Sequence, residues 1–259
     1  MNINLLMQFS SLIFLLGIIC KCSSLQVIDL TWPFDNQTIF WSKSQQRFSY
    51  TKQVAEERNG YWYSVNDFCS GEHVGTHFDA PYHFYETGWK IGDVPPHRLI
   101  AKGAFIDLQD KTAKLGQATM LEVADLERWE KEHGSFENET VLLVKFGWSK
   151  YWYNRTLYMG LEGDSFNFPG ISEEAAEYLV NSGKFYGIGV DTASVDPGSS
   201  TTFRAHVIFS KNQMYNLENV KITETLPAKG FTLLALPMKL KDGTGASVRI
   251  LALPDQKLW

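Results

Sequence analysis

The sequence is poor in cysteine and in basic charge, and it has no apolar run long enough for a transmembrane helix. Three cysteines in 259 residues are too few for a disulfide-stapled scaffold. The 24 Lys and Arg residues are outnumbered by 29 Asp and Glu residues, which gives a net charge of −5 and indicates no face for nucleic acid. No G-x-S-x-G motif occurs, so the usual signature of an α/β-hydrolase serine nucleophile is missing.

An apolar run of nine residues, 12–20, lies near the N-terminus. A transmembrane helix needs about 20 apolar residues, whereas the hydrophobic region of a secretory signal peptide needs about 7–15. The small residues Ser23 and Ser24 follow the run, so we predict a signal peptide over residues 1–24 and a secreted protein. No Lys or Arg precedes the run, and an uncleaved signal anchor is the alternative that the sequence leaves open.

Removal of residues 1–24 would leave Cys69 as the one cysteine of the mature chain. Without a disulfide, stability has to come from a large core, which a chain of this size can form. Three N-glycosylation sequons, at Asn36, Asn138 and Asn154, agree with a secreted glycoprotein. No internal repeat, low-complexity tract or Pro/Ser-rich linker interrupts residues 25–259, so we predict a single domain there.

Apolar and β-branched runs predict strands through the whole domain, and several of them are apolar enough to be covered on both faces. The predicted strands are 27–30, 48–54, 104–108, 140–146, 185–190, 231–236 and 248–253. Between them we predict a helix capped by Thr119 and Glu122 that ends at Gly134, a helix from Ser172 to Gly183, and a helix over 202–211. Strands and helices alternate only partly, which favours a compact mixed α/β domain.

The segment 73–83, HVGTHFDAPYH, carries the strongest functional signal. It places His73, His77 and His83 within eleven residues, together with Asp79. Imidazole nitrogens and carboxylate oxygens are the ligands that a catalytic Zn²⁺ or Mn²⁺ prefers. The alternative is a loop of individually hydrogen-bonded histidines, which this density disfavours. A divalent cation in such a site activates water for attack on a carbonyl carbon.

This string resembles the HxGTHxDxPxH signature of the metal-dependent cyclase family, which includes bacterial-type kynurenine formamidases and isatin hydrolases. The resemblance covers nearly the whole predicted mature chain. It includes the Asp29-Leu30 opening, the aromatic Trp41, the Gly-Val-Asp-Thr run at 189–192, and a His and a Glu further on. It implies a fold of the swivelling β/β/α type and a homo-oligomer.

The resemblance also implies roles for individual residues. The family's metal ligands in the signature map to His73, His77 and Asp79, and its acid/base histidine maps to His83. His206 and Glu218 stand at the spacing of twelve residues that the family uses for a second metal. Glu218 and Asp79 would then bridge two divalent ions, either Zn²⁺ or Mn²⁺, which five ligands can hold by sharing.

Other residues are weaker candidates. We interpret Cys69 as a small buried apolar residue, and His97 and His133 as structural. Asp191 and Asp196 follow a buried strand, and a capped turn and a functional role are both consistent with them.

These observations together predict a secreted, metal-dependent amidohydrolase that cleaves a non-peptide C–N bond. The leading substrate is a small aromatic amide of the N-formylkynurenine type, as for an arylformamidase of tryptophan catabolism, and the alternative is ring opening of a cyclic amide such as isatin. Trp41 corresponds to an aromatic residue of the formamidase substrate pocket, but the Pro-Gly that commonly follows it there is missing. A hypothesis of another class is a secreted metal-binding protein without catalysis.

Overall fold

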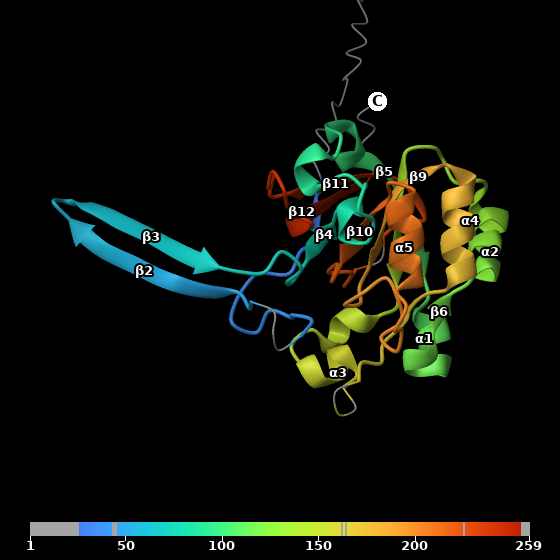
Figure 1. Ribbon diagram of the computed structural model, residues 1–259, viewed down its shortest axis with the longest axis horizontal. Coiled ribbons are helices and arrows are strands. Elements are labelled where there is room, and N and C mark those ends of the chain that lie inside the picture. The colour runs from blue at the N-terminus through green and yellow to red at the C-terminus, as the bar shows by residue number, and fades with distance from the viewer. Residues whose placement is uncertain (1–25, 43–45, 162, 164, 225, 255–259) are drawn as a thin grey trace, which may run out of the picture.

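The computed structural model describes residues 26–254, apart from 43–45, 162, 164 and 225 (Figure 1). The predicted signal peptide, residues 1–24, lies outside the described residues, so secretion stays a prediction. The asparagines of all three sequons lie on the surface. Among the helices that the structure describes, none has the length and apolar character needed to cross a bilayer.

The centre of the molecule is a sheet that curls into a barrel. Its strand order is β1-β12-β11-β5-β7-β9-β10-β4, and an additional pairing of β12 with β4 closes the ring. The pairings β5–β7, β7–β9 and β9–β10 are parallel, and the others are antiparallel. The strands are β1 (Ile28–Asp29), β4 (His77–Asp79), β5 (Ile100–Asp107), β7 (Thr140–Lys145), β9 (Phe185–Val190), β10 (Tyr215–Glu218), β11 (Lys229–Pro237) and β12 (Gly245–Pro254).

Strand β7 shows why the apolar runs form this sheet. All six of its residues are buried, and successive side chains point to opposite faces. Val141 and Leu143 belong to the cluster inside the barrel, while Leu142 and Val144 belong to the cluster between the sheet and the helices. A strand covered on both faces therefore reads as a continuous apolar segment, and the predicted strand is confirmed.

Three helices, α2 (Val123–His133), α4 (Glu173–Ser182) and α5 (Arg204–Lys211), cover the same side of the sheet (Figure 1). Helix α4 begins as predicted, because the Ser172 side chain accepts a hydrogen bond from the Ala175 amide, and it ends at Gly183 in a left-handed conformation. The shorter elements are α1 (Gln109–Leu115), α3 (Arg155–Met159), the strand pair β6 (Met120–Leu121) with β8 (Gly170–Ile171), and the 3₁₀ turns η1 (Pro81–His83), η2 (Ile91–Asp93), η3 (Pro96–Leu99), η4 (Gly116–Ala118) and η5 (Trp148–Tyr151).

The predicted N-terminal cap of helix α2 is wrong. Glu122 is its N-cap, in a capping box with Asp125, and the hydroxyl of Thr119 instead donates to the Gly116 carbonyl. The two residues between Thr119 and Glu122 form β6, which pairs with β8 and holds the chain extended until Glu122. The predicted end of the helix at Gly134 is confirmed.

Strands β2 (Ser49–Arg58) and β3 (Tyr61–Cys69) form a two-stranded hairpin that projects from the body, and we call it the arm (Figure 1). The apolar pattern of the sequence predicts only the first part of β2. The Asn59-Gly60 turn, in which both residues have positive φ, is the signal that would have identified the hairpin. Cys69 lies at the end of the arm and is exposed, so its prediction as a buried residue is wrong.

Candidate functional site

Two parts of the chain that are far apart in the sequence meet at the end of the barrel. Strand β4 carries His77 and Asp79, and β10 carries Glu218. The two strands are antiparallel neighbours, and their register places Glu218 directly opposite His77. Helix α5, which precedes β10, brings His206 to the same place. The tertiary structure therefore assembles the candidate residues through one strand pairing and one helix.

The carboxylate of Asp79 lies at the centre of this group and is buried. Its Oδ1 atom is 2.7 Å from His73 Nδ1 and 3.1 Å from His77 Nε2. Its Oδ2 atom is 3.2 Å from His206 Nε2. The second carboxylate, Glu218, is 3.4 Å from His77 Nε2 and 3.0 Å from His206 Nε2. The five residues predicted as metal ligands are thus brought together.

His73, His77 and His206 each turn one ring nitrogen toward the carboxylates. The second ring nitrogen of each lies on the outer side of the site and has a hydrogen-bond partner there. His206 Nδ1 is 2.6 Å from Oδ2 of the buried Asp196. His77 Nδ1 is 2.9 Å from the carbonyl oxygen of Gly75, a residue with a positive φ of 63°. Such contacts fix the ring orientation and leave the inner nitrogen to face Asp79 and Glu218.

His73 has a longer outer network. Its Nε2 is 2.8 Å from the hydroxyl oxygen of Thr244, and that hydroxyl donates to Glu72 Oε2 at 2.6 Å. Glu72 also accepts hydrogen bonds from the backbone amides of Thr244 and Gly245. The hydroxyl therefore accepts the His73 Nε2–H, and Nδ1 is the nitrogen that faces Asp79.

The buried carboxylates attract positive charge strongly. Burial alone would raise the pKa of Asp79, but His77 and His73 hold it well below its usual value. Burial would lower the pKa of His77, but Asp79 and Glu218 overcome this and raise it to about 10. The pKa of His206 is raised in the same way, by Asp196, Asp79 and Glu218 against its burial. This environment favours cations at the inner nitrogens.

The ligand atoms form two groups whose members lie within 4.8 Å of one another. One group is His73, Asp79 and His83, and the other is His77, Asp79 and Glu218. Asp79 belongs to both, so it is the carboxylate that two cation positions would share. His83, predicted as an acid/base residue, is also near enough to be counted with a ligand group.

His83 lies at the mouth of the site, and its ring is stacked on that of His73 at 3.9 Å between centroids. Desolvation lowers the pKa of His83 to about 4, although Asp79 opposes this, and the side chain still meets solvent. The imidazole is therefore uncharged at neutral pH.

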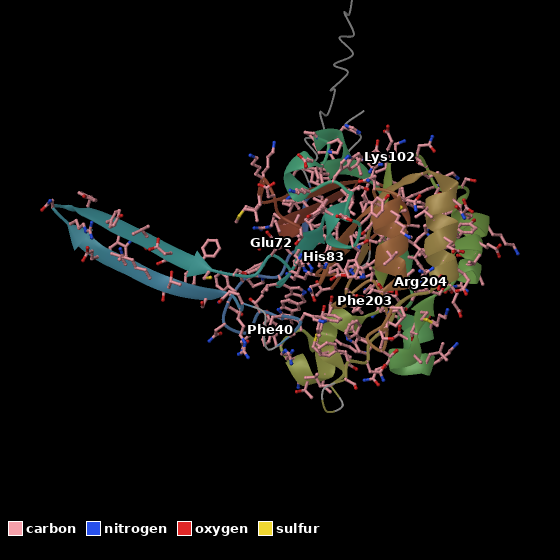
Figure 2. The ribbon with its side chains drawn as sticks, viewed as in Figure 1. Phe40, Glu72, His83, Lys102, Phe203 and Arg204 are labelled. Carbon is pink, nitrogen blue, oxygen red and sulfur yellow. The ribbon has the colours of Figure 1, made fainter. Side chains whose placement is uncertain are left out.

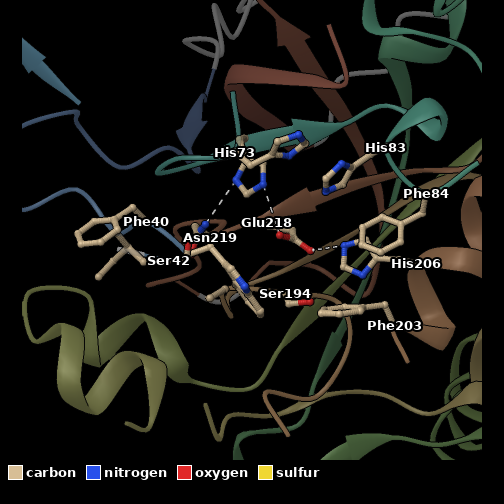
Figure 3. A pocket seen from close by; sticks show the side chains of 14 residues that line it. Phe40, Ser42, His73, His83, Phe84, Ser194, Phe203, His206, Glu218 and Asn219 are labelled. Carbon is tan, nitrogen blue, oxygen red and sulfur yellow. Dashed lines mark hydrogen bonds and ion pairs between the residues drawn. The ribbon is translucent and has the colours of Figure 1, made fainter. Parts of the chain in front are cut away.

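A cavity of about 370 Å³ opens over these residues (Figure 3). Aromatic rings from three parts of the chain form its walls, and they are Phe40, Trp41, Phe84 and Phe203. The predicted pocket residue Trp41 is half-buried. Its ring packs edge-on against the ring of Phe166, with 4.7 Å between the ring centroids. Phe203 has a φ of +49°, a rare conformation for a bulky residue, directly before α5. The cavity thus combines an apolar wall with a charged floor.

The structure gives different roles to Asp191 and Asp196, for which the sequence allowed both a capped turn and a functional role. Asp191 accepts hydrogen bonds from the amides of Phe146 and Trp148, so it holds a turn together. Asp196 orients His206, as described above. His97, as predicted, is not among the residues that line the cavity, and His133 lies at the end of α2 against Trp129.

Asn219 lines the cavity, although no sequence motif marks it as a site residue. Its Nδ2 donates to the Gly75 carbonyl at 2.7 Å, and its Oδ1 accepts a hydrogen bond from the buried Tyr158 hydroxyl at 2.9 Å. The Gly75 carbonyl thus accepts from both Asn219 and His77. An Asn directly after a candidate ligand is a weak sequence signal, and only the tertiary structure reveals this network.

Comparison with known proteins shows the family of the chain. The model of the Cyclase family, described as "Putative cyclase", matches residues 28–197, and the chain belongs to this family. The isatin hydrolase of Roseibium aggregatum is 30% identical over 223 residues, which cover 82% of this chain and 83% of that protein. The kynurenine formamidase of Bacillus mycoides is 29% identical over 234 residues, which cover 88% of this chain and 98% of that protein.

Solved structures agree with this assignment. Isatin hydrolase A from Ralstonia solanacearum superposes with a TM-score of 0.81 and 27% identity, covering 89% of this chain and 92% of that chain. An isatin hydrolase bound to the product analogue thioisatinate gives a TM-score of 0.82 and 27% identity, covering 90% and 93%. The predicted cyclase-family fold and the predicted compact α/β domain are confirmed.

We expect Asn219→Ala to lower the free energy of unfolding by about 1–3 kcal/mol, because it removes one of two hydrogen bonds at the buried Tyr158 hydroxyl and one of two at the Gly75 carbonyl. Urea denaturation followed by circular dichroism measures this change. Asn66→Ala, at an exposed position on the arm, is the control and should change stability by less than about 0.5 kcal/mol. Equal effects of the two substitutions would contradict a structural role for the Asn219 network.

Proposed function

We propose that the chain is a metal-dependent hydrolase of C–N bonds in small aromatic amides. The observation that supports this most directly is the convergence of His77, His206 and Asp79 with Glu218 under an aromatic cavity. Relatives named isatin hydrolase and kynurenine formamidase match most of the chain, and both names describe hydrolases of amide bonds. The activity therefore agrees with the family as well as with the site.

The residues fit a divalent metal site. The donors are imidazole nitrogens and carboxylate oxygens, without sulfur, and they suit Zn²⁺ and Mn²⁺ alike. In our proposal the ligands are His73, His77, Asp79, His206 and Glu218, and Asp79 is shared between two cation positions. A bound divalent cation supplies polarisation of an amide carbonyl and a lowered pKa of water.

The remaining residues of the site bind the substrate and move protons. The rings of Trp41, Phe84 and Phe203 present an apolar wall to an aryl group, and the amide then lies above the carboxylates. The uncharged His83 accepts a proton from the attacking water and returns it to the departing nitrogen. A C–O bond forms at the carbonyl carbon, the C–N bond breaks, and the products are a carboxylate and an amine.

Two substrates follow from these roles. An N-formyl aromatic amine such as N-formylkynurenine releases formate, whereas isatin gives an opened ring in which acid and amine stay on one molecule. The isatin alternative is supported by the identity of 30% to one isatin hydrolase and by the two solved structures. In our proposal the aromatic wall contacts the aryl ring of either substrate.

Purified full-length protein, loaded with Zn²⁺ or Mn²⁺, should hydrolyse at least one of these two amides, and ultraviolet absorbance follows both reactions. Treatment with a chelator should abolish turnover, and re-addition of metal should restore it. Turnover that is unaffected by complete metal removal would contradict the proposal. Metal binding without turnover of either amide would favour the non-catalytic metal-binding hypothesis.

We expect His83→Ala to reduce kcat by about 10²–10⁴-fold, because the proton path to the leaving nitrogen is removed. Elemental analysis of the same preparation should find the metal content unchanged. Loss of metal together with activity would instead make His83 a ligand, as its place beside His73 and Asp79 allows. Unchanged activity and unchanged metal content would refute both roles.

We expect Glu218→Gln to lower the metal content from two ions per chain toward one, because a neutral amide is a weaker ligand than the carboxylate opposite His77. The metal-to-protein ratio after dialysis measures this. Glu132→Gln, on the exposed surface of α2, is the control and should keep the full content. A ratio that stays the same in both variants rules out metal binding by Glu218.

A further inference from the structure

The strand pairing that closes the barrel lies directly against the proposed cation site. Strand β4 pairs with β10 along one edge and with β12 along the other. The register of the second pairing places Gly245 opposite Asp79. The amide of Ala80 adds a hydrogen bond to the carbonyl of Thr244 at 2.9 Å. We call this pairing of β12 with β4 the seam, because it closes the ring of strands.

The carboxylate of Glu72 holds the beginning of the seam. Glu72 lies where the chain leaves the arm and enters the body, and its side chain is half-buried (Figure 2). Its Oε2 atom accepts three hydrogen bonds, from the Thr244 hydroxyl at 2.6 Å, from the Thr244 amide at 2.8 Å and from the Gly245 amide at 3.3 Å. The residue that directly precedes the proposed ligand His73 is therefore fixed to the strand that closes the barrel.

The proton of the Thr244 hydroxyl determines which nitrogen of His73 is free. A threonine hydroxyl has one proton to donate, and an ionised carboxylate can only accept. The hydroxyl therefore donates to Glu72, and its oxygen accepts from His73 Nε2 at 2.8 Å. The lone pair for a cation is then on Nδ1, which lies 2.7 Å from Asp79 Oδ1. Without Glu72 the hydroxyl could donate to Nε2, and Nδ1 would hold the ring proton instead.

Gly245 allows the backbone of β12 to approach the His73 ring. A Cβ atom at this position would lie 2.6 Å from His73 Cε1 and 2.6 Å from the Phe78 carbonyl oxygen, which is too close for either contact. The His73 ring also stacks on that of His83, with 3.9 Å between the ring centroids. The seam therefore confines the ring that Thr244 orients.

We propose that Glu72 and Thr244, the positioning pair, orient His73 for a cation, and that cation binding at His73 is coupled to closure of the seam. The inference rests on the metal site of the proposed function and deepens it, because it assigns residues outside the ligand set. A hydrogen-bond acceptor on the outer nitrogen of a ligating imidazole fixes the ring and increases its basicity. Since coupling between two sites is reciprocal, a seam that orients His73 is itself stabilised by the cation.

The positioning pair acts on one of the two cation positions. His73 belongs to one group of ligand atoms, with Asp79 and His83, and is absent from the group that contains His77 and Glu218. The outer nitrogen of His77 faces a backbone carbonyl instead of the pair. Loss of the pair should therefore weaken one bound ion and spare the other.

Titration of the metal-free full chain with Mn²⁺, with free Mn²⁺ followed by electron paramagnetic resonance, tests the positioning pair. Thr244→Val keeps the shape of threonine without the hydroxyl, and we expect it to weaken one ion about 10–100-fold and to spare the other. Thr244→Ser keeps the hydroxyl and should bind Mn²⁺ like the wild type. Equal Mn²⁺ affinities in Thr244→Val and the wild type overturn the proposal.

Glu72→Gln tests the carboxylate itself. The new amide group can donate to the Thr244 hydroxyl, so the proton of that hydroxyl is no longer committed. We expect the same ion to be weakened about tenfold. The double variant with Thr244→Val should be no weaker than Thr244→Val alone, because both residues act through one contact. Glu57→Gln, at an exposed position on the arm, is the control, and additive losses overturn the pair.

Hydrogen exchange of the wild type tests the coupling without any variant. Residues 244–248 contain no proposed ligand, so protection there reports the seam and not coordination. We expect their amides to exchange about tenfold more slowly with Mn²⁺ bound than in the metal-free protein. Residues 49–69 of the arm should exchange alike in both. Unchanged exchange at 244–248 overturns the coupling. A wild type that binds no Mn²⁺ overturns the proposed function as well, whereas the other outcomes leave that function standing.

Discussion

The site depends on the burial of the Asp79 carboxylate. A buried charge is costly unless it is paired and hydrogen-bonded, and Asp79 meets this requirement only because His73, His77 and His206 surround it. His206 lies on helix α5, outside the sheet that carries His77 and Asp79. Strand β10 has to pair with β4, and α5 has to pack beside them, before the charge can be accommodated.

The outer partners make the three imidazoles unequal. His206 faces the carboxylate of Asp196, His77 faces a backbone carbonyl, and His73 faces a hydroxyl. A carboxylate increases the basicity of the ring it contacts more than a neutral oxygen does. The two cation positions that we propose around Asp79 would therefore differ in ligand strength.

The cavity places opposite properties next to each other. Its walls are aromatic, its floor is formed by His77, His206 and the buried Glu218 carboxylate, and His83 stands at its mouth. An aryl amide can contact the wall and the floor together, as the proposed function requires. Strand β3 ends a few residues before His73, so the chain runs from the arm directly into this site.

The sequence by itself determined the chemistry of the site and most of the regular structure. The ligand types, the aromatic Trp41, the strand β7 and the helix that begins at Ser172 follow from local patterns of side chains. The tertiary structure decided what depends on distant pairing: the contact of Glu218 with His77, the sharing of Asp79, the network of Asn219 and the exposure of Cys69. Residue type is a local property, whereas convergence is set by the register of strands and the packing of helices, which no short segment contains.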